Sequence, residues 1–421
     1  MTSESQTLPA PNTVLESFRG KTSSATLWSG YLHAAFLWLW LWDFVFIPTL
    51  YTLDLGFSFS LNATYLVRFN YIGAFAGALF YHAATSTSIR LFRLSIVFSV
   101  VTIVAIVRGI WLREPDGVFA SHVFYTVMPV AMMSYGWSLK ESLETNSFLR
   151  HRFVVVMRWG FAVGVACAMV FLLGRKLGLS SYDALGISNL QVAAPFLAFG
   201  PYGSGYLIAA MVFTWLMAKR ATIVVFVAYG LVYVYLARRR FRQIVLVGLV
   251  VLPVVAFQTR AALPSEGRTV RALEYLVSGD LDAASGNRWS EAVSAMAELS
   301  NSWVSMLAGS GFGASFLPWP DLADYATYRS HYVHFTPLSY AWIGGLLMPF
   351  LVYGELFVLA FSLVVLARRR RLAPEDCGLA LLIPGLIIGS AFGASLLNNA
   401  FSWVVIGAGL RAKWMASQPP I

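Results

Sequence analysis

Apolar segments of about twenty residues recur along most of this chain, which is the length an α-helix needs to cross a bilayer. Lipid offers no hydrogen-bond partner to a peptide group, so such segments must fold as helices or as a closed barrel. The segments do not alternate apolar and polar residues, which favours helices. Charged residues make up only 12% of the 421 residues, against roughly a quarter in a soluble domain. We therefore predict an all-α, polytopic membrane helix bundle.

Reading the segments in order predicts about twelve transmembrane helices. Residues 1–30 form a polar N-terminal tail, residues 31–258 hold spans one to nine, and residues 337–421 hold spans ten to twelve and the C-terminus. The predicted spans are 31–50, 63–84, 94–112, 118–139, 153–174, two short spans within 185–218 that are separated by GPYGSG, 221–236, 244–258, 337–366, 378–396 and 400–414.

One long hydrophilic segment, residues 259–336, lies between spans nine and ten. Within it, residues 268–277 and 288–299 place apolar side chains at helical spacing. Asn287 is expected to cap the second of these helices, because its side chain can accept a hydrogen bond from an early amide. We predict that this segment is a helical cap, and that its tryptophans lie against the bilayer surface.

The basic residues indicate how the chain is oriented. The net charge is +10, but most of the charge lies in short loops between apolar segments, and such loops stay cytoplasmic. The cap is then periplasmic, both termini are cytoplasmic, and no nucleic-acid partner is expected. The basic loops contain Arg90 and Arg93, Lys140 to Arg158, Arg238 to Arg242, and Arg368 to Arg371.

Several basic residues fall on the outer side against this rule, and three of them are candidates for the site. Lys219 and Arg220 open a span there, and Arg288 begins the second cap helix. A planar, permanently charged guanidinium suits a phosphate or a diphosphate. The alternatives are that Arg220 extends to lipid headgroups and that Arg288 is an ordinary solvated side chain.

His334 lies where the chain returns from the cap to the membrane, in the sequence HYVHFTPLSYAWIGG. Histidine is the common side chain that titrates near neutral pH, so at this boundary it can act as a base. His331 is a competing candidate three residues earlier, and an interfacial hydrogen-bonding role is the alternative for either residue.

Other features of the sequence carry less chemistry. The GSGFG stretch around Gly311 allows close approach of a backbone but follows no predicted strand, so a dinucleotide site is unsupported. Asp280 and Asp282 resemble a metal-binding DxD motif but have no further ligand. Asp43 and Glu355 lie inside spans, where a carboxylate either has a function or pairs between helices. With no nucleotide-binding loop, CxxC, GxSxG or HExxH, we expect neither a metal nor another cofactor.

The stretches KRAT from Lys219, NRWSEAV around Arg288, GSGFG, and HFTPLSYAWIGGLL from His334 resemble the bacterial O-antigen ligase and O-antigen polymerase superfamily of membrane glycosyltransferases. The resemblance runs from about residue 188 to residue 347. Two positions depart from the family pattern: Phe335 stands where Asn often follows the His, and Lys219 stands where Ser is more usual.

The resemblance implies a metal-independent, inverting transfer of a glycan from undecaprenyl diphosphate at the periplasmic face of the bacterial inner membrane. In that interpretation His334 is the catalytic base, and Arg220, Arg288 and Lys219 bind the diphosphate. Further candidate substrate contacts are His331, Trp289, Gly311 and Arg68.

The family analogy favours a ligase, which uses a lipid A–core acceptor, because one outer loop dominates. A polymerase that extends a carrier-linked glycan is the alternative. A flippase fits less well, because the chain shows no internal repeat and the candidate residues lie at the outer surface instead of the membrane midplane.

Overall fold

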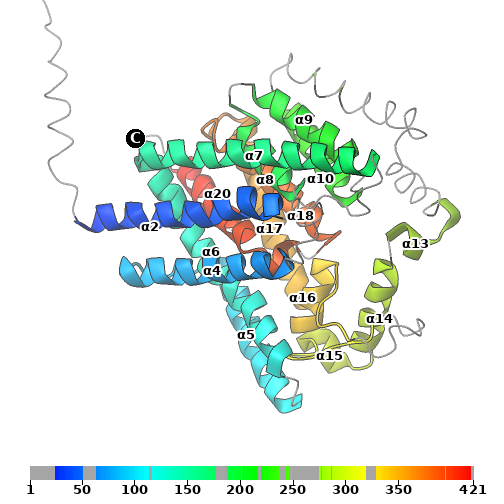
Figure 1. The fold of residues 1–421 in the computed structure, drawn as a ribbon. Helices are drawn as coiled ribbons and strands as arrows, with labels where there is room; N and C mark the ends of the chain where they lie inside the picture. Colours follow the sequence, from blue (N-terminus) through cyan, green and yellow to red (C-terminus); the bar gives the residue numbers. More distant parts are fainter. Residues whose placement is uncertain are drawn as a thin grey trace, which may run out of the picture.

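The chain folds into packed helices, as the computed structural model in Figure 1 shows. The structure describes residues 24–50, 63–112, 116–176, 187–200, 202–216, 220–237, 277–285, 287–318, 329–393 and 395–418, together with the single positions 243, 245, 248 and 275. Within these ranges the regular structure is helical, and one isolated antiparallel bridge joins Phe316 to Ser330. The predicted all-α class is confirmed.

The N-terminal half consists of long helices that follow the predicted spans closely. They are α2 (Ser24–Leu41), which continues through a π-helical turn η1 (Trp42–Phe46), then α4 (Ala63–Ala84), α5 (Arg93–Leu112), α6 (Asp116–Thr145) and α7 (Ser147–Lys176). Helices α6 and α7 extend past their apolar cores because the polar residues at their ends continue the helix.

The middle of the chain contains α8 (Ile187–Leu197), α9 (Gly203–Leu216) and α10 (Arg220–Leu236). The break predicted at GPYGSG is confirmed as the turn between α8 and α9. A side chain at Gly203 would overlap the carbonyl of Ala198, so glycine is required at this close approach. The predicted span 244–258 and most of the predicted helix 268–277 lie outside the described residues.

The C-terminal part begins with three short helices, α13 (Leu281–Ser285), α14 (Arg288–Ser300) and α15 (Trp303–Ala308). The helix predicted from residue 288 is confirmed by α14, and the periplasmic cap stays a prediction. The remaining helices are α16 (Thr336–Gly344), α17 (Leu347–Arg368), α18 (Cys377–Ser390), α19 (Ser395–Asn398) and α20 (Ala400–Ser417). In Figure 1, α13 to α15 lie well away from the C-terminal end of the chain.

Two predicted spans were wrong as continuous helices. Residues 337–366 form α16 and α17, which are separated at Gly345, whose φ is 81°. A side chain at Gly345 would overlap the carbonyl of Leu307, and the Leu346 amide donates to the carbonyl of Met306 at 2.8 Å. The chain therefore bends where it meets α15. Residues 378–396 likewise break, because α18 ends at Ser390.

Five of the described helices are long and apolar enough to cross a membrane. They are Trp28–Leu50, Arg93–Leu112, Val118–Thr145, Ser147–Gly174 and Leu347–Arg368. Shorter apolar helices, such as α9 and α18, pack among them. The helices support a membrane protein, and the count of twelve spans stays a prediction.

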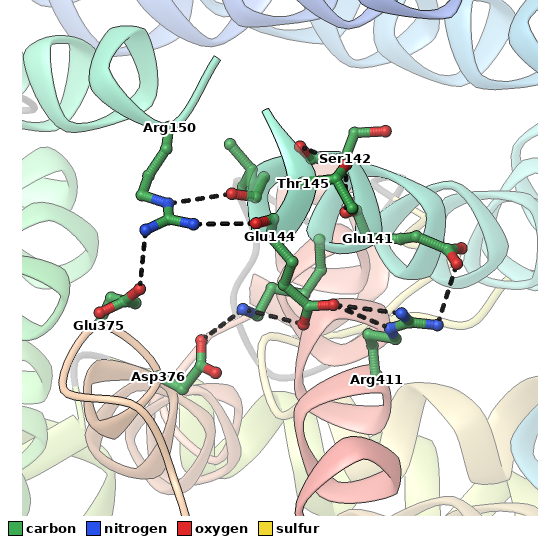
Figure 2. A network of polar contacts seen from close by, with 10 residues as sticks. Glu141, Ser142, Glu144, Thr145, Arg150, Glu375, Asp376 and Arg411 are labelled. Carbon is green, nitrogen blue, oxygen red and sulfur yellow. Dashed lines mark hydrogen bonds and ion pairs between the residues drawn. The ribbon is translucent and has the colours of Figure 1, made fainter. Parts of the chain in front are cut away.

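One end of the bundle carries a network of ion pairs, and we call it the network end (Figure 2). Lys140 of α6 lies 3.1 Å from Glu144 and 2.8 Å from Asp376, which precedes α18. Arg411 of α20 pairs with Glu144 at 3.2 Å. The network therefore ties the end of α6 to the start of α18 and to α20.

Two of the basic regions that were predicted to share one side of the membrane meet at the network end. The predicted loop 140–158 is mostly helical, because α6 continues to Thr145 and α7 begins at Ser147. Arg150, near the start of α7, pairs with Glu375 at 3.6 Å. Glu375 follows the 368–371 arginine run by a few residues. These two loops therefore lie at the same end of the bundle, as the charge pattern predicts.

Helices α6 and α20 cross in direct backbone contact at two glycines. A side chain at Gly136 would overlap the carbonyl of Val404, and one at Gly407 would overlap the carbonyl of Met133. Small residues let two helices approach closely where lipid provides no hydrophobic driving force between them.

Replacing Gly136 with Leu should force α6 and α20 apart and destabilise the protein. Overpacking of this kind costs about 1–3 kcal/mol or more, and here the clash is with backbone that cannot rotate away. The measurement is the thermal unfolding midpoint in detergent. Gly354→Leu on α17 is the control, since nothing lies within 4 Å of a Cβ at that position. Equal midpoints for the two variants would contradict the predicted helix contact.

Candidate active site

The backbone around His334 is fixed by hydrogen bonds from several elements. We call residues 329–335 the His334 segment. Ser330 exchanges two backbone hydrogen bonds with Phe316, each 2.8 Å long. The amide of Val333 donates to Oγ of Ser339 at 2.8 Å, and the same hydroxyl donates to the Val333 carbonyl at 2.7 Å. His334 therefore projects from a backbone that is held immediately before it.

His334 is paired with a buried carboxylate, that of Glu291 on α14. The distances from Nδ1 of His334 to the two carboxylate oxygens are 3.1 and 2.9 Å, and the His334 amide donates to Oε2 at 3.1 Å. The Glu291 side chain is 2% exposed and the His334 side chain is 38% exposed. An ionised carboxylate only accepts hydrogen bonds, so the Nδ1 proton of His334 points at Glu291.

This pairing leaves the other ring nitrogen free to act. Of the described residues, none hydrogen-bonds Nε2 of His334. In the neutral ring that nitrogen carries a lone pair, and a carboxylate on Nδ1 both orients the ring and stabilises the cation that forms after proton uptake. The His334–Glu291 pair is therefore built as a base with its orienting carboxylate.

Glu291 was missed at the sequence level, although a signal was present. It shares the buried face of α14 with Ala295 and Leu299, four and eight residues later. An acidic residue on the apolar stripe of an amphipathic helix needs a buried partner. That spacing alone marks Glu291 as unusual.

His331, the competing candidate, has a different environment. Its Nε2 lies 3.5 Å from the Tyr125 hydroxyl, and the two rings are stacked with centroids 6.3 Å apart. Burial and the positive charge of Arg68 lower the pKa of His331. A lowered pKa makes His331 a weaker base than an ordinary histidine, and among the described residues no carboxylate orients it. Arg68 itself is exposed, on α4.

Arg288 begins α14 one turn before Glu291 and is exposed. Its Nη1 donates to the carbonyl of Phe392, in the loop between α18 and α19. The hydroxyl of Thr336, two residues after His334, donates to the carbonyl of Gly393 at 2.6 Å. Arg288 and the start of α16 therefore meet at the same short loop. Trp289 is half-exposed beside Arg288.

The backbone of Arg220 can be placed from the packing of α10. Leu236, at the end of α10, and Cys377, at the start of α18, line one cavity, and Tyr229 packs against Gly385. The two helices are therefore antiparallel. The start of α10 at Arg220 lies about 13 Å beyond Tyr229, toward the end of α18 that leads to Phe392. Lys219 and the side chain of Arg220 lie outside the described residues.

The GSGFG loop packs against helices. The amide of Ser310 donates to the Trp342 carbonyl at 2.7 Å, and that of Phe312 donates to the Ala105 carbonyl at 3.0 Å. Gly311, with a φ of 89°, is buried, and a Cβ there would lie 3.0 Å from the Gly109 nitrogen. The close backbone approach predicted for this stretch is confirmed by its packing on α5.

The two carboxylates of the DxD stretch stabilise helix starts. Oδ1 of Asp280 accepts from the Ala283 amide at 2.9 Å, and Oδ1 of Asp282 accepts from the Ser290 amide at 2.9 Å. The described residues contain no group of three or more His, Cys, Asp or Glu side chains that could hold a metal ion. Asn287 takes the N-cap position of α14 with φ 65°, but the prediction that its side chain caps the helix was wrong. Asp282 and Ser285 accept the early amides of α14 instead.

The two carboxylates predicted inside spans have partners. Glu355 lies 3.7 Å from Nη1 of Arg93, an ion pair between α17 and α5. Asp43 lies in η1 and hydrogen-bonds the side chain of Asn70 on α4. Of the two alternatives left open by the sequence, these contacts favour helix pairing.

No protein-family model, no curated protein and no solved structure matches this chain. The fold and the site define an all-helical protein of membrane character with a His–Glu pair and an arginine at one end of the bundle. Its function is inferred from these residues.

Proposed function

We propose that this chain is a membrane glycosyltransferase of the O-antigen ligase type, which transfers a glycan from undecaprenyl diphosphate to a lipid A–core acceptor. The observation that carries the proposal is the His334–Glu291 pair, held 2.9 Å apart with Nε2 of the ring free, one helical turn from Arg288. A base beside a cation is what attack on a diphosphate-linked sugar requires.

In the proposed reaction, Nε2 of His334 takes the proton of an acceptor sugar hydroxyl. The resulting oxygen bonds to the anomeric carbon of the donor, and the bond from that carbon to the diphosphate oxygen breaks. The configuration at the anomeric carbon inverts, and the carrier diphosphate leaves with the bonding electron pair. Glu291 stabilises the imidazolium until the proton passes to water.

The leaving diphosphate gains negative charge during this step, so a cation beside it has its largest effect in the transition state. Arg288 supplies one guanidinium at the site, and we assign Arg220 and Lys219 to the same role because α10 starts at this end of the bundle. Arg68, Trp289 and His331 are proposed to contact the glycan. No metal or other cofactor takes part in the proposed step.

Arg288→Gln should weaken use of the donor more than use of the acceptor. Loss of a charge-assisted contact costs about 1.5–3 kcal/mol, which corresponds to roughly a tenfold or larger fall in kcat/KM for the carrier-linked donor. Glutamine can still donate to the Phe392 carbonyl, so the loop contact is retained. Donor and acceptor titrations check this, and an unchanged donor kcat/KM would remove Arg288 from the diphosphate site.

The proposal places about twelve spans in the bacterial inner membrane, with the active site facing the periplasm. Its support is the separation between the network end, where two basic loops meet, and the end that holds α14 and His334. Basic loops are retained in the cytoplasm, so the opposite end faces out. Reaction of a cysteine placed at Val277, which is exposed, with an impermeant thiol reagent in intact cells tests this orientation.

The alternative is an O-antigen polymerase, and the products separate the two. Cells with an inactive ligase accumulate unlinked polymer on the carrier, whereas cells with an inactive polymerase attach single repeat units to the core. We expect the first pattern when His334 is replaced in a host that makes O-antigen through this protein. The second pattern would assign the chain as a polymerase, and unlinked glycan that fails to reach the periplasm would assign a flippase.

A further inference from the structure

His122 of α6 is fully buried and joins two segments far away in the sequence. Its Nδ1 accepts a hydrogen bond from the Gly313 amide, 191 residues later, at 3.1 Å. Its Nε2 lies 2.7 Å from the carbonyl of His331, 209 residues later. One side chain therefore connects α6, the GSGFG loop and the His334 segment.

The contacts fix the state of this ring. A backbone amide can only donate, so Nδ1 of His122 must carry a lone pair. A carbonyl can only accept, so Nε2 must carry the proton. Only the neutral ring with its proton on Nε2 satisfies both partners. The backbone groups it holds are buried or half-buried, where an unpaired polar group costs about 1–3 kcal/mol.

The His331 carbonyl lies just ahead of the residues that present the His334–Glu291 pair. The next hydrogen bonds along the chain are those from the Val333 amide to the Ser339 hydroxyl and from the His334 amide to the Glu291 carboxylate. Nothing else among the described residues hydrogen-bonds the His331 carbonyl. The hydrogen bond from His122 therefore fixes the position of the backbone at His331, three residues before His334.

We infer that His122 is a positioning residue, which holds the His334 segment so that the His334 ring meets Glu291. The inference rests on the proposed function for its catalytic consequence, but the positioning itself is a property of the fold. His122 hydrogen-bonds the backbone groups of His331 and Gly313 and neither side chain of the pair, so it acts through the backbone. Loss of the His122 contacts should therefore slow the chemical step more than it weakens substrate binding.

The test compares His122→Phe with His122→Gln. Phenylalanine fills the space and removes both hydrogen bonds, whereas glutamine offers one acceptor and one donor in a single side chain. We expect kcat to fall about 10-fold or more in the phenylalanine variant, because a small misplacement of a catalytic group costs rate, with KM nearly unchanged. Glutamine should restore a substantial part of kcat.

His33→Phe is the matched control. His33 is also fully buried and also bridges helices, through the Tyr135 hydroxyl at 2.9 Å and the Ser142 hydroxyl at 2.9 Å, but it does so away from His334. This variant should lose thermal stability to a similar degree while keeping its kcat once folded. Equal losses of kcat in His33→Phe and His122→Phe would overturn the inference.

Hydrogen exchange gives a readout that does not depend on activity. Peptides that cover residues 329–339 should exchange several-fold faster in His122→Phe than in the wild type or in His33→Phe, because the Val333 and His334 amides lose their fixed geometry. If this peptide exchanged at the wild-type rate in His122→Phe, positioning by His122 would be refuted. A wild-type protein without transferase activity would refute the proposed function alone, and the exchange result would still decide the role of His122.

Discussion

Replacing His334 with Asn should lower kcat for glycan transfer by about 10²–10⁴-fold, the usual contribution of a general base. Asparagine is the informative substitution because its amide can still donate to Glu291 from nearly the position of Nδ1. It removes Nε2 while leaving the buried carboxylate paired. Loss of activity would therefore report loss of the base and not collapse of the site. Initial rates with purified protein and carrier-linked donor are the measurement.

The companion variant is His331→Asn, because His331 is the other histidine in the same segment. Burial and the charge of Arg68 lower the pKa of His331, and among the described residues it has no orienting carboxylate. We expect a much smaller fall in kcat from this change. A reversed ranking, with His331→Asn inactive and His334→Asn active, would move the base to His331.

Replacing Glu291 with Gln should reduce kcat by up to about 10⁴-fold, the loss found when the carboxylate that orients a catalytic histidine is replaced by its amide. A glutamine amide turned toward Nδ1 would donate to it and place the ring proton on Nε2, which is the wrong tautomer for a base. The imidazolium formed after proton uptake would also lose its counter-charge. The change should appear in kcat more than in KM, and Glu291→Asp should retain part of the activity because it keeps the charge.

Glu298→Gln on the same helix is the control for this prediction. Glu298 is half-buried, and its Oε1 accepts a hydrogen bond from the Leu317 amide at 3.3 Å, so it resembles Glu291 without touching a histidine. Its replacement should alter stability modestly and leave kcat close to wild type. If the two variants have the same kcat, Glu291 is a structural carboxylate only.

The sequence predicted the straight helices well and the bent ones poorly. Apolar length alone located α4, α5 and α10 to within a residue or two, because lipid-length helices need no tertiary information. The break at Gly345 could not be predicted this way. It exists because α15 packs against the turn, and apolar residues continue on both sides of it.

The candidate site shows the same division. Position and titration chemistry were enough to select His334 and Arg288 from the sequence. Glu291 and His122 required contacts between residues 43 and 209 positions apart, which a single sequence does not reveal. The sequence did contain a signal for Glu291, which is an acidic residue on the apolar face of its helix. It contained none for His122, which resembles any histidine inside a span. Asn287 failed as a cap because Asp282, five residues earlier, reaches the same helix start.

The central claim is that His334, oriented by Glu291, activates an acceptor hydroxyl for attack on a diphosphate-linked glycan without a metal. The most direct measurement is transfer by the purified protein in lipid vesicles, with undecaprenyl diphosphate-linked glycan, lipid A–core acceptor and excess chelator, for wild type and His334→Asn. The account predicts a lipid A–core-linked product from wild type that persists in chelator and is lost in the variant. Equal product from both proteins would contradict it.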